Sequence, residues 1–145
     1  MDANAYLGRT IGSWRLRRLL GQGAFGGVFE AEDVATPGRL GAIKILRPEL
    51  ALQPDIRQRF LNEAAAASRA DHDNIVRILD QGSTTDGVSF LVMELLKGST
   101  LTQVLRGGAL TPTRTIHIGV QIASALQGAH AQGIVHRDLK PDNIF

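Results

Sequence analysis

The chain has 145 residues, of which 43% are hydrophobic and 21% charged, and its net charge at pH 7 is +2. This balance predicts a folded globular protein rather than a disordered one, and so small a charge offers little field for binding nucleic acid or a membrane surface. The absence of cysteine excludes disulfides, thiolate metal sites and a catalytic thiol. No apolar run approaches the ~20 residues that span a bilayer, and no signal peptide is visible, so we expect a cytoplasmic protein.

The first predicted elements are two strands joined by glycines. The apolar segment Trp14–Leu20 leads into a glycine cluster at residues 21–27, and the alternating segment Val28–Glu32 follows, which predicts a β-hairpin. The cluster has the spacing Gly-x-Gly-x-x-Gly from Gly21, but a strand follows it where a dinucleotide-binding Rossmann turn requires a helix. The glycines are then either ordinary turn residues or a flexible flap whose backbone N–H groups cover phosphates.

A lysine lies in the middle of the next predicted strand. The segment Gly41–Leu46 is apolar except for Lys44, and strand alternation puts Lys44 on the same face as Ala42. A helix beginning near Pro54 follows, and Glu63 falls on its otherwise apolar stripe. Burying either charge alone is costly, whereas a pair is tolerable, so we expect Lys44 to pair with Glu63. The alternatives are a purely structural pair and a lysine that extends its ammonium into solvent.

Two further strands and then helices are predicted in the rest of the chain. The strand candidates are Val76–Asp80 and Ser89–Glu94, which bring the total to five strands. After a hinge at residues 97–99 the pattern becomes helical, with a short helix within residues 101–106. A longer helix begins at Thr111, an N-cap residue followed by proline, and ends near a glycine.

Polar side chains are concentrated near the end of the sequence. Residues 136–143 contain six polar or charged side chains, directly after Ile134–Val135, which we predict to be a short strand. A solvated surface loop is the usual explanation of such a cluster. The apolar segments on both sides favour instead a loop of fixed geometry, in which Asp138 could handle a proton and Asn143 could bind a metal ion.

Together these motifs resemble the first half of a eukaryotic-like serine/threonine protein kinase domain of the bacterial (Hanks) type. The glycine cluster with Val28 is similar to the family's glycine-rich loop, and Ala42-Ile43-Lys44 is similar to its third-strand motif. His136-Arg137-Asp138, with Asn143 five residues on, resembles the catalytic loop, and Lys140 resembles the serine/threonine-specific form of it. The resemblance implies an α+β fold: a five-stranded antiparallel N-lobe with one long helix, and the helical beginning of a C-lobe.

The resemblance implies a role for each matching residue. Lys44 would contact the α- and β-phosphates of ATP and be held by Glu63. Asp138 would orient the substrate hydroxyl and accept its proton, Lys140 would contact the transferred phosphate, and Asn143 would hold Mg²⁺. The remaining ATP-binding residues that it implies, with Met93 as the gatekeeper beside the adenine, are Leu20, Gly21, Gln22, Gly23, Ala24, Phe25, Gly26, Val28, Ala42, Met93, Glu94 and Leu96.

The resemblance also implies an organisation and a function. Residues 1–13 would be an N-terminal extension, 14–96 the ATP-binding lobe, and 97–145 the start of the catalytic lobe. The implied reaction is transfer of the γ-phosphoryl group of Mg·ATP to a Ser or Thr hydroxyl of a protein substrate. Because the family's Asp-Phe-Gly motif is not within the chain, we expect this stretch alone to be truncated and nearly inactive. The alternatives are a short non-catalytic nucleotide-binding or interaction module, and a small-molecule phosphotransferase.

Overall fold

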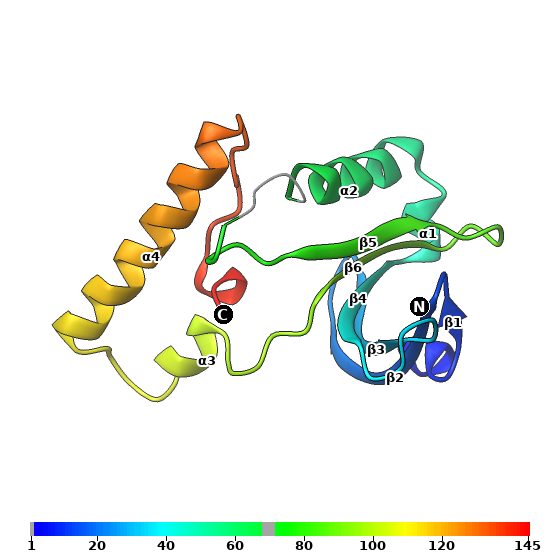
Figure 1. Ribbon diagram of the computed structural model, residues 1–145, viewed down its shortest axis with the longest axis horizontal. Helices are drawn as coiled ribbons and strands as arrows, with labels where there is room; N and C mark the ends of the chain where they lie inside the picture. The colour runs from blue at the N-terminus through cyan, green and yellow to red at the C-terminus, as the bar shows by residue number, and fades with distance from the viewer. Residues whose placement is uncertain (1, 68–71) are drawn as a thin grey trace. The chain divides into compact units, whose positions relative to one another are not determined.

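Within residues 2–67 and 72–145, which the computed structural model describes apart from the side chains of residues 3 and 63–67, six strands form one antiparallel sheet. The strand order is β1-β2-β3-β4-β6-β5 (Figure 1). The chain divides into two units. The first unit, which holds the sheet, consists of Met1–Ser68 and Arg77–Leu95, and the second consists of Arg69–Val76 and Leu96–Phe145.

Five strands of the sheet correspond to the predicted ones, although β5 begins at Ile78 and ends at Ser83 where Val76–Asp80 was predicted, and the sheet has a sixth strand. The six strands are β1 (Thr10–Ile11), β2 (Trp14–Gln22), β3 (Gly26–Asp33), β4 (Leu40–Leu46), β5 (Ile78–Ser83) and β6 (Ser89–Glu94). The additional strand, β1, contains two residues and pairs with the start of β2 across a turn at Gly12, whose φ is +59°. So short a strand carries no alternating pattern from which it could have been predicted.

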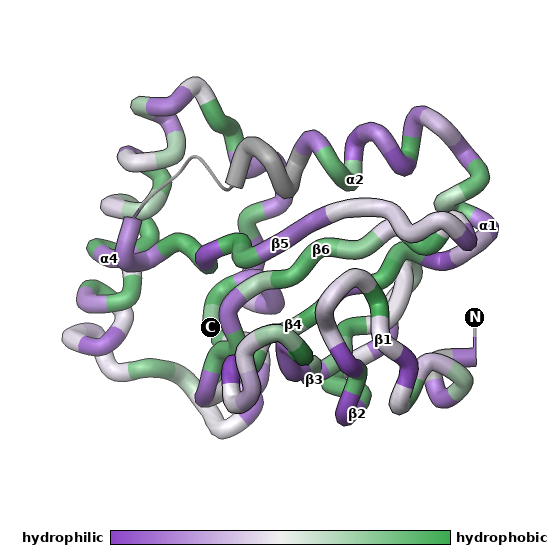
Figure 2. Tube along the Cα trace, turned by 45° about the vertical axis from the view of Figure 1, so that its right-hand side comes forward, coloured by the Kyte–Doolittle hydropathy of each residue, from purple (hydrophilic) through white to green (hydrophobic). Residues whose placement is uncertain are grey.

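The sheet buries one of its faces. Phe29, Ile43 and Val92 are direct cross-strand neighbours in β3, β4 and β6, and all three are fully buried. Each such side chain contributes about 2 kcal/mol by leaving water. The same cluster contains eight more buried residues: Tyr6, Ile11, Trp14, Leu16, Ala31, Ile45, Val88 and Phe90. The hydrophobic colour along β6 in Figure 2 shows how apolar this strand, which lies between β4 and β5, is.

Two helices pack beyond the end of β4. The first, α1 (Pro48–Ala51), was not predicted, because a single turn is too short for a helical period. The second, α2 (Pro54–Ala67), begins at the predicted proline and runs beside β5 (Figure 1). Phe60 of α2 is buried with Leu46 and Ala51 in a second apolar cluster. This cluster fixes the helix against the sheet.

The second unit contains α3 (Leu101–Leu105), α4 (Pro112–Ala131) and the short 3₁₀ helix η2 (Pro141–Asn143). Both α-helices begin at threonine caps, at Thr100 and, as predicted, at Thr111. The predicted short strand Ile134–Val135 is wrong: the described residues include no strand there. The two residues are apolar but have no strand to pair with, and an isolated segment without a partner cannot form a ladder.

The segment before β5 packs on one stripe of α4. His72 Nε2 lies 3.0 Å from Ser124 Oγ, and the side-chain amide of Asn74 donates to Gln121 at 3.0 Å. A Cβ atom added at Gly128 would lie 3.0 Å from the His72 ring, so glycine permits this close approach. Residues 72–76 therefore belong structurally with α4, although β5 begins only two residues later in the chain.

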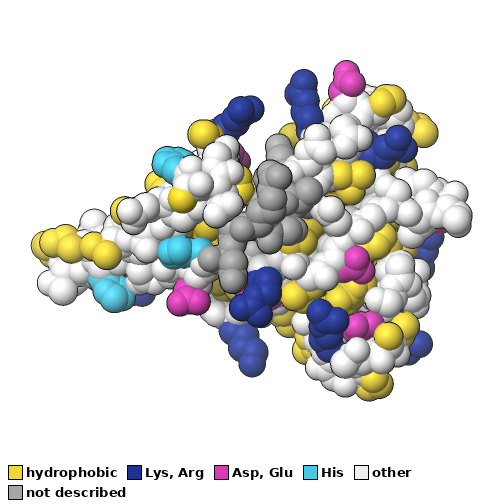
Figure 3. Space-filling model, turned by 45° about the horizontal axis from the view of Figure 1, so that its top comes forward, with side chains coloured by type: hydrophobic (Ala, Val, Ile, Leu, Met, Phe, Trp, Pro, Cys, Tyr) yellow, Lys and Arg dark blue, Asp and Glu magenta, His cyan; other side chains and the backbone are white. Residues whose placement is uncertain are grey.

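A neighbouring stripe of α4 is apolar and exposed. Ile116 and Val120, four residues apart, are 67% and 63% exposed. Figure 3 shows such hydrophobic side chains, in yellow, among the polar ones at the surface. Despite this apolar stripe, no helix in the described ranges has the length and hydropathy needed to cross a bilayer.

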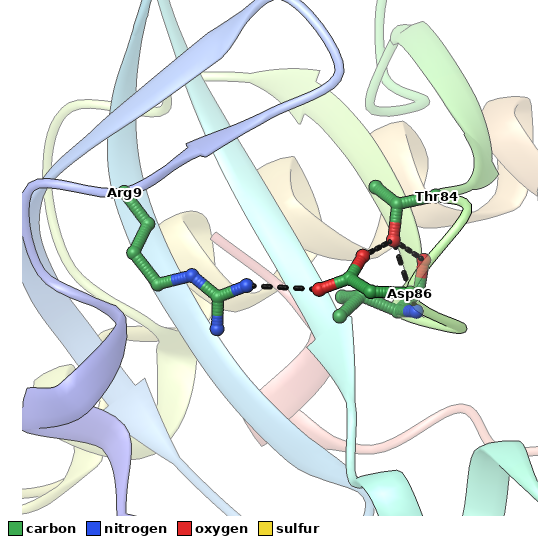
Figure 4. A network of polar contacts seen from close by, with 4 residues as sticks. Arg9, Thr84 and Asp86 are labelled. Carbon is green, nitrogen blue, oxygen red and sulfur yellow. Dashed lines mark hydrogen bonds and ion pairs between the residues drawn. The ribbon is translucent and has the colours of Figure 1, made fainter.

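An ion pair ties the segment before β1 to the β5–β6 turn (Figure 4). Arg9 Nη2 lies 3.0 Å from Asp86 Oδ2, and Arg9 also stacks on the Tyr6 ring at 5.0 Å. The Thr84 hydroxyl donates to the other oxygen of Asp86 and, as an acceptor, binds the N–H of Val88. The hydrogen bond from Thr84, helped by the backbone and by Arg9 and opposed by desolvation, lowers the pKa of the Asp86 carboxyl.

We expect Asp86→Asn to lower the Tm by about 2 °C at pH 7 and to have a smaller effect at pH 2. Because the pKa of Asp86 is lower in the folded than in the unfolded chain, its ionised form stabilises the fold at neutral pH. That contribution decreases as the pH falls below the unfolded-state pKa, about 4, and is lost once the pH is below the lowered pKa of the folded chain. Thermal unfolding followed by circular dichroism at both pH values tests this. A difference in Tm that persisted undiminished in acid would mean that the amide disturbs the turn itself, contrary to the prediction.

Candidate functional site

The glycine cluster forms the turn between β2 and β3. Gly23 lies at its start and donates its N–H to the carbonyl of Gly26 at 2.9 Å. A Cβ atom added at Gly26 would lie 1.8 Å from the carbonyl oxygen of Ile45, so strand pairing requires glycine there. A Cβ atom added at Gly21 or Gly23 would meet nothing within 4 Å. The fold does not need glycine at these two positions, and the space beside them is open to a ligand.

Four side chains assigned to nucleotide binding share one face of the sheet. Val28 lies directly opposite Lys44 in the β3–β4 pairing, and Ala42 lies opposite Met93 in the β4–β6 pairing. Directly opposed residues project to the same face, and so do residues two apart on a strand. All four side chains therefore lie on the face opposite the buried core row, and the glycine turn is at one end of it.

The other residues of the glycine turn are exposed. Leu20 lies at a register shift of the β2–β3 ladder and is 40% exposed, and Phe25 at the tip is 59% exposed. Gln22 ends β2, and Ala24 lies in the turn, and both are exposed. The structure thus places these residues along the rim of the sheet and not in its core.

Lys44 is half-buried beside α2. Its ammonium lies 5.8 Å from the centroid of the Phe60 ring, a cation–π distance. Glu63 follows Phe60 by three residues, so the two positions are neighbours on the helix surface. The side chain of Glu63 lies outside the described part of the chain, as does its expected pairing with Lys44.

The residues assigned to adenine binding lie at the end of β6 and beyond. Glu94 donates its N–H to the carbonyl of Arg77 at 2.9 Å, and its carboxylate accepts the N–H of Arg77 at 2.8 Å. These two bonds fix the end of the strand next to Met93. Leu96 lies in the second unit.

In the second unit, Asp138, Lys140 and Asn143 form one polar cluster. The Asp138 carboxylate accepts from Lys140 Nζ at 2.9 Å and from Asn143 Nδ2 at 3.1 Å, and Asn143 Nδ2 also donates to the Asp138 carbonyl at 2.8 Å. The N–H of Asn143 donates to the carbonyl of Lys140 within η2. The loop therefore has the fixed relative geometry that proton handling needs.

These contacts keep Asp138 ionised. The hydrogen bond from Lys140, with smaller contributions from Asn143 and from the charge of His136, outweighs desolvation and lowers the pKa of Asp138. The same carboxylate raises the pKa of Lys140. Asp138 is thus a hydrogen-bond acceptor at neutral pH. The residue before it, Arg137, has a φ of +60°, an unfavourable left-handed conformation for a non-glycine residue, which turns the chain sharply at this point.

Asn143 has the donor chemistry for a hard cation. Its Nδ2 atom is bonded to Asp138, which leaves its amide oxygen as the atom that could ligate a metal, and Mg²⁺ prefers such oxygen ligands. The described residues contain no cluster of three or more His, Cys, Asp or Glu side chains suited to a metal ion. Asn143 therefore offers a cation a single amide oxygen.

Sequence analysis did not single out Arg47, which contacts the glycine turn. Its Nη2 atom donates to the carbonyl of Gly23 at 2.8 Å, and its N–H donates to the carbonyl of Phe25 at 2.9 Å. The sequence shows only an arginine before a proline, and nothing in that pattern indicates a partner 24 residues away.

An antiparallel sheet with the helix α2, a glycine turn at one end of a sheet face that carries a lysine, and a loop with an Asp–Lys–Asn cluster are the features expected of a protein kinase domain. Comparison with known families agrees, since residues 14–145 match the model of the protein kinase domain. The chain belongs to this family. Proteins with similar sequences, PknH and Pkn3 among them, are named serine/threonine-protein kinases.

The similarity extends along the whole chain. It is 44% identical to PknH of Mycobacterium tuberculosis over 140 residues, which are 96% of this chain and 22% of that protein. It is 40% identical to Pkn3 of Myxococcus xanthus, over 99% of this chain and 26% of that protein. The crystal structure of the M. tuberculosis PknI kinase domain superimposes with a TM-score of 0.82 at 32% identity, over 94% of this chain and 55% of that one. The chain thus spans about a quarter of the length of these curated relatives.

Proposed function

We propose that this chain is the ATP-binding lobe and catalytic loop of an ATP-dependent serine/threonine protein kinase, with residues 14–96 as the lobe that binds the nucleotide. The observation that carries the proposal is the shared sheet face of Val28, Ala42, Lys44 and Met93 beside a glycine turn with open space. The apolar members of this face suit a flat heterocycle, and the lysine at its end suits a phosphate. The named relatives support the same reaction.

The first unit would bind and position the nucleotide. Lys44 would donate hydrogen bonds to its α- and β-phosphate oxygens, and Glu63, one turn beyond Phe60 in α2, would hold the ammonium in place. The glycine turn would close over the phosphates, because Gly21 and Gly23 allow the backbone to approach them without side-chain clashes. When bound, Mg·ATP supplies the phosphoryl group that is transferred.

The second unit would act on the protein substrate. Asp138, ionised and held by Lys140 and Asn143, would orient a Ser or Thr hydroxyl and accept its proton. Lys140 would neutralise charge on the group in transfer, and Asn143 would offer its amide oxygen to Mg²⁺. The second candidate, a non-catalytic nucleotide-binding module, would use only the features of the first unit.

Calorimetric titration of the 145-residue chain with Mg·ATP tests the proposal. We expect saturable binding that weakens at least about tenfold in Lys44→Met, because a charge-assisted contact to phosphate is lost. Arg17→Met is the matched control. Arg17 pairs with Glu32 on the same sheet, so this substitution also removes one positive charge, but far from the glycine turn. Circular dichroism establishes that each variant is folded.

The possible outcomes separate the two candidate functions. Equal losses of affinity in Lys44→Met and Arg17→Met would contradict the assigned site. Binding that depends on Lys44, without transfer to any Ser/Thr peptide by a longer form of the protein that includes an Asp-Phe-Gly motif, would favour the non-catalytic module. Transfer by that form establishes the kinase.

A further inference from the structure

Arg47 joins three segments of the first unit. Its N–H donates to the carbonyl of Phe25 in the glycine turn at 2.9 Å, and its carbonyl accepts the N–H groups of Leu50 and Ala51, the last two residues of α1. Pro48, the next residue, restricts Arg47 to an extended conformation, and its φ and ψ are −58° and 140°. The backbone of Arg47 is therefore fixed by hydrogen bonds of both its N–H and its carbonyl, independently of its side chain.

The side chain adds a bond that the sheet does not provide. Arg47 Nη2 donates to the carbonyl of Gly23 at 2.8 Å, a short, charge-assisted distance. Gly23 belongs to the turn and not to a strand, and its N–H already bonds to Gly26. Two carbonyls of the turn, that of Gly23 at its start and that of Phe25 at its tip, are thus both bound by the residue that follows β4.

The guanidinium is held in this place at a cost. Its Nε atom is buried and has no hydrogen-bond partner among the described residues. A buried donor without a partner destabilises a fold, so an arginine in this position needs a compensating contact. The bond to Gly23 is that contact in the structure.

We infer that Arg47 is a positioning residue for the glycine-rich turn, acting through the Gly23 carbonyl. Carbonyl oxygens repel phosphate oxygens, and a carbonyl bound by a cation cannot rotate toward them. By fixing both carbonyls, Arg47 holds the turn in the shape in which Gly21 and Gly23 leave their space open. The inference rests on the proposed nucleotide site for its functional consequence, whereas the restraint on the turn is independent of any ligand.

The test compares three variants with the unaltered 145-residue chain. Arg47→Gln keeps a polar atom near the buried Nε position but is too short to reach Gly23, and Arg47→Lys restores the charge and one donor. Arg17→Gln is the matched control. Amide hydrogen exchange at Gly23, read by NMR without nucleotide, reports the turn, and calorimetry with Mg·ATP reports affinity.

We expect Arg47→Gln to speed exchange at Gly23 about tenfold and to weaken Mg·ATP affinity about fivefold, with partial recovery of both in Arg47→Lys. The control should change neither. If Arg47→Gln lowers Tm more than the control does, Arg47→Met takes its place with the same two expectations.

If the rate of amide exchange at Gly23 is unchanged in the Gln or Met variant, the inference is wrong, even if the affinity for Mg·ATP falls. The loss of affinity would then mean that the guanidinium acts on the nucleotide through its charge and not through the turn. If amide exchange at Gly23 is faster but the affinity for Mg·ATP is unchanged, Arg47 restrains the turn without any effect on nucleotide binding, and that part of the inference is wrong. If the unaltered chain binds no Mg·ATP, the proposed function fails, and the exchange rates still decide whether Arg47 restrains the turn.

Discussion

Replacing Asp138 with Asn is expected to reduce phosphoryl transfer by about a thousandfold and to change Mg·ATP affinity by less than about twofold. The amide cannot accept the proton of a substrate hydroxyl. It can still accept hydrogen bonds from Lys140 and Asn143, so the loop should keep its shape. The rate is measured with a Ser/Thr peptide on a longer form of the protein that transfers phosphate, and affinity by calorimetry on the same form.

Asp142→Asn is the matched control for this prediction. It removes one negative charge from the same loop, within η2, but Asp142 makes none of the contacts that hold the Asp138 cluster together. Most of the activity should remain. A similar loss in both variants would show that the net charge of the loop matters more than an acceptor at position 138. A tenfold loss of nucleotide affinity in Asp138→Asn would likewise contradict its assignment to the hydroxyl.

Gly26→Ala is expected to destabilise the fold by about 3 kcal/mol. The added Cβ atom would lie 1.8 Å from the carbonyl oxygen of Ile45 and 2.9 Å from its carbon, both backbone atoms. Relief requires the paired ends of β3 and β4 to separate, which removes ladder hydrogen bonds next to the turn. Urea unfolding followed by circular dichroism measures the difference in the free energy of unfolding.

Gly23→Ala is the comparison that separates packing from ligand binding. Its Cβ atom would meet nothing within 4 Å, so stability should change by less than about 0.5 kcal/mol. Affinity for Mg·ATP should nevertheless fall, because the methyl group occupies space that the phosphates need. Equal destabilisation by Gly23→Ala and Gly26→Ala would contradict the clash at Gly26. Unchanged affinity in Gly23→Ala would mean that the turn does not approach the nucleotide.

Local patterns predicted most of the secondary structure, and they failed where elements are shortest. The hairpin, the buried strand around Lys44, the helix from Pro54 and the capped helix after Thr111 each contain several turns or several alternations of side chains. Strand β1 and helix α1 contain two and four residues, too few for a period to show. The strand predicted at residues 134–135 is absent because these residues connect α4 to the polar loop, and the N–H of Ile134 donates to the carbonyl of Ala129 in α4.

The sequence alone determined the alternation of side chains along β4, because side-chain direction in a strand is a local property. Lys44 therefore projects from the face of the sheet opposite to the one on which Ile43 packs in the core. The motif spacing also placed Asp138 and Asn143 in one short loop, with only four residues between them, so the chain itself keeps them close. The pairing of Arg47 with Gly23 was decided only by the tertiary structure. It depends on the register of β3 against β4, which brings residues distant in sequence together and which no local pattern encodes.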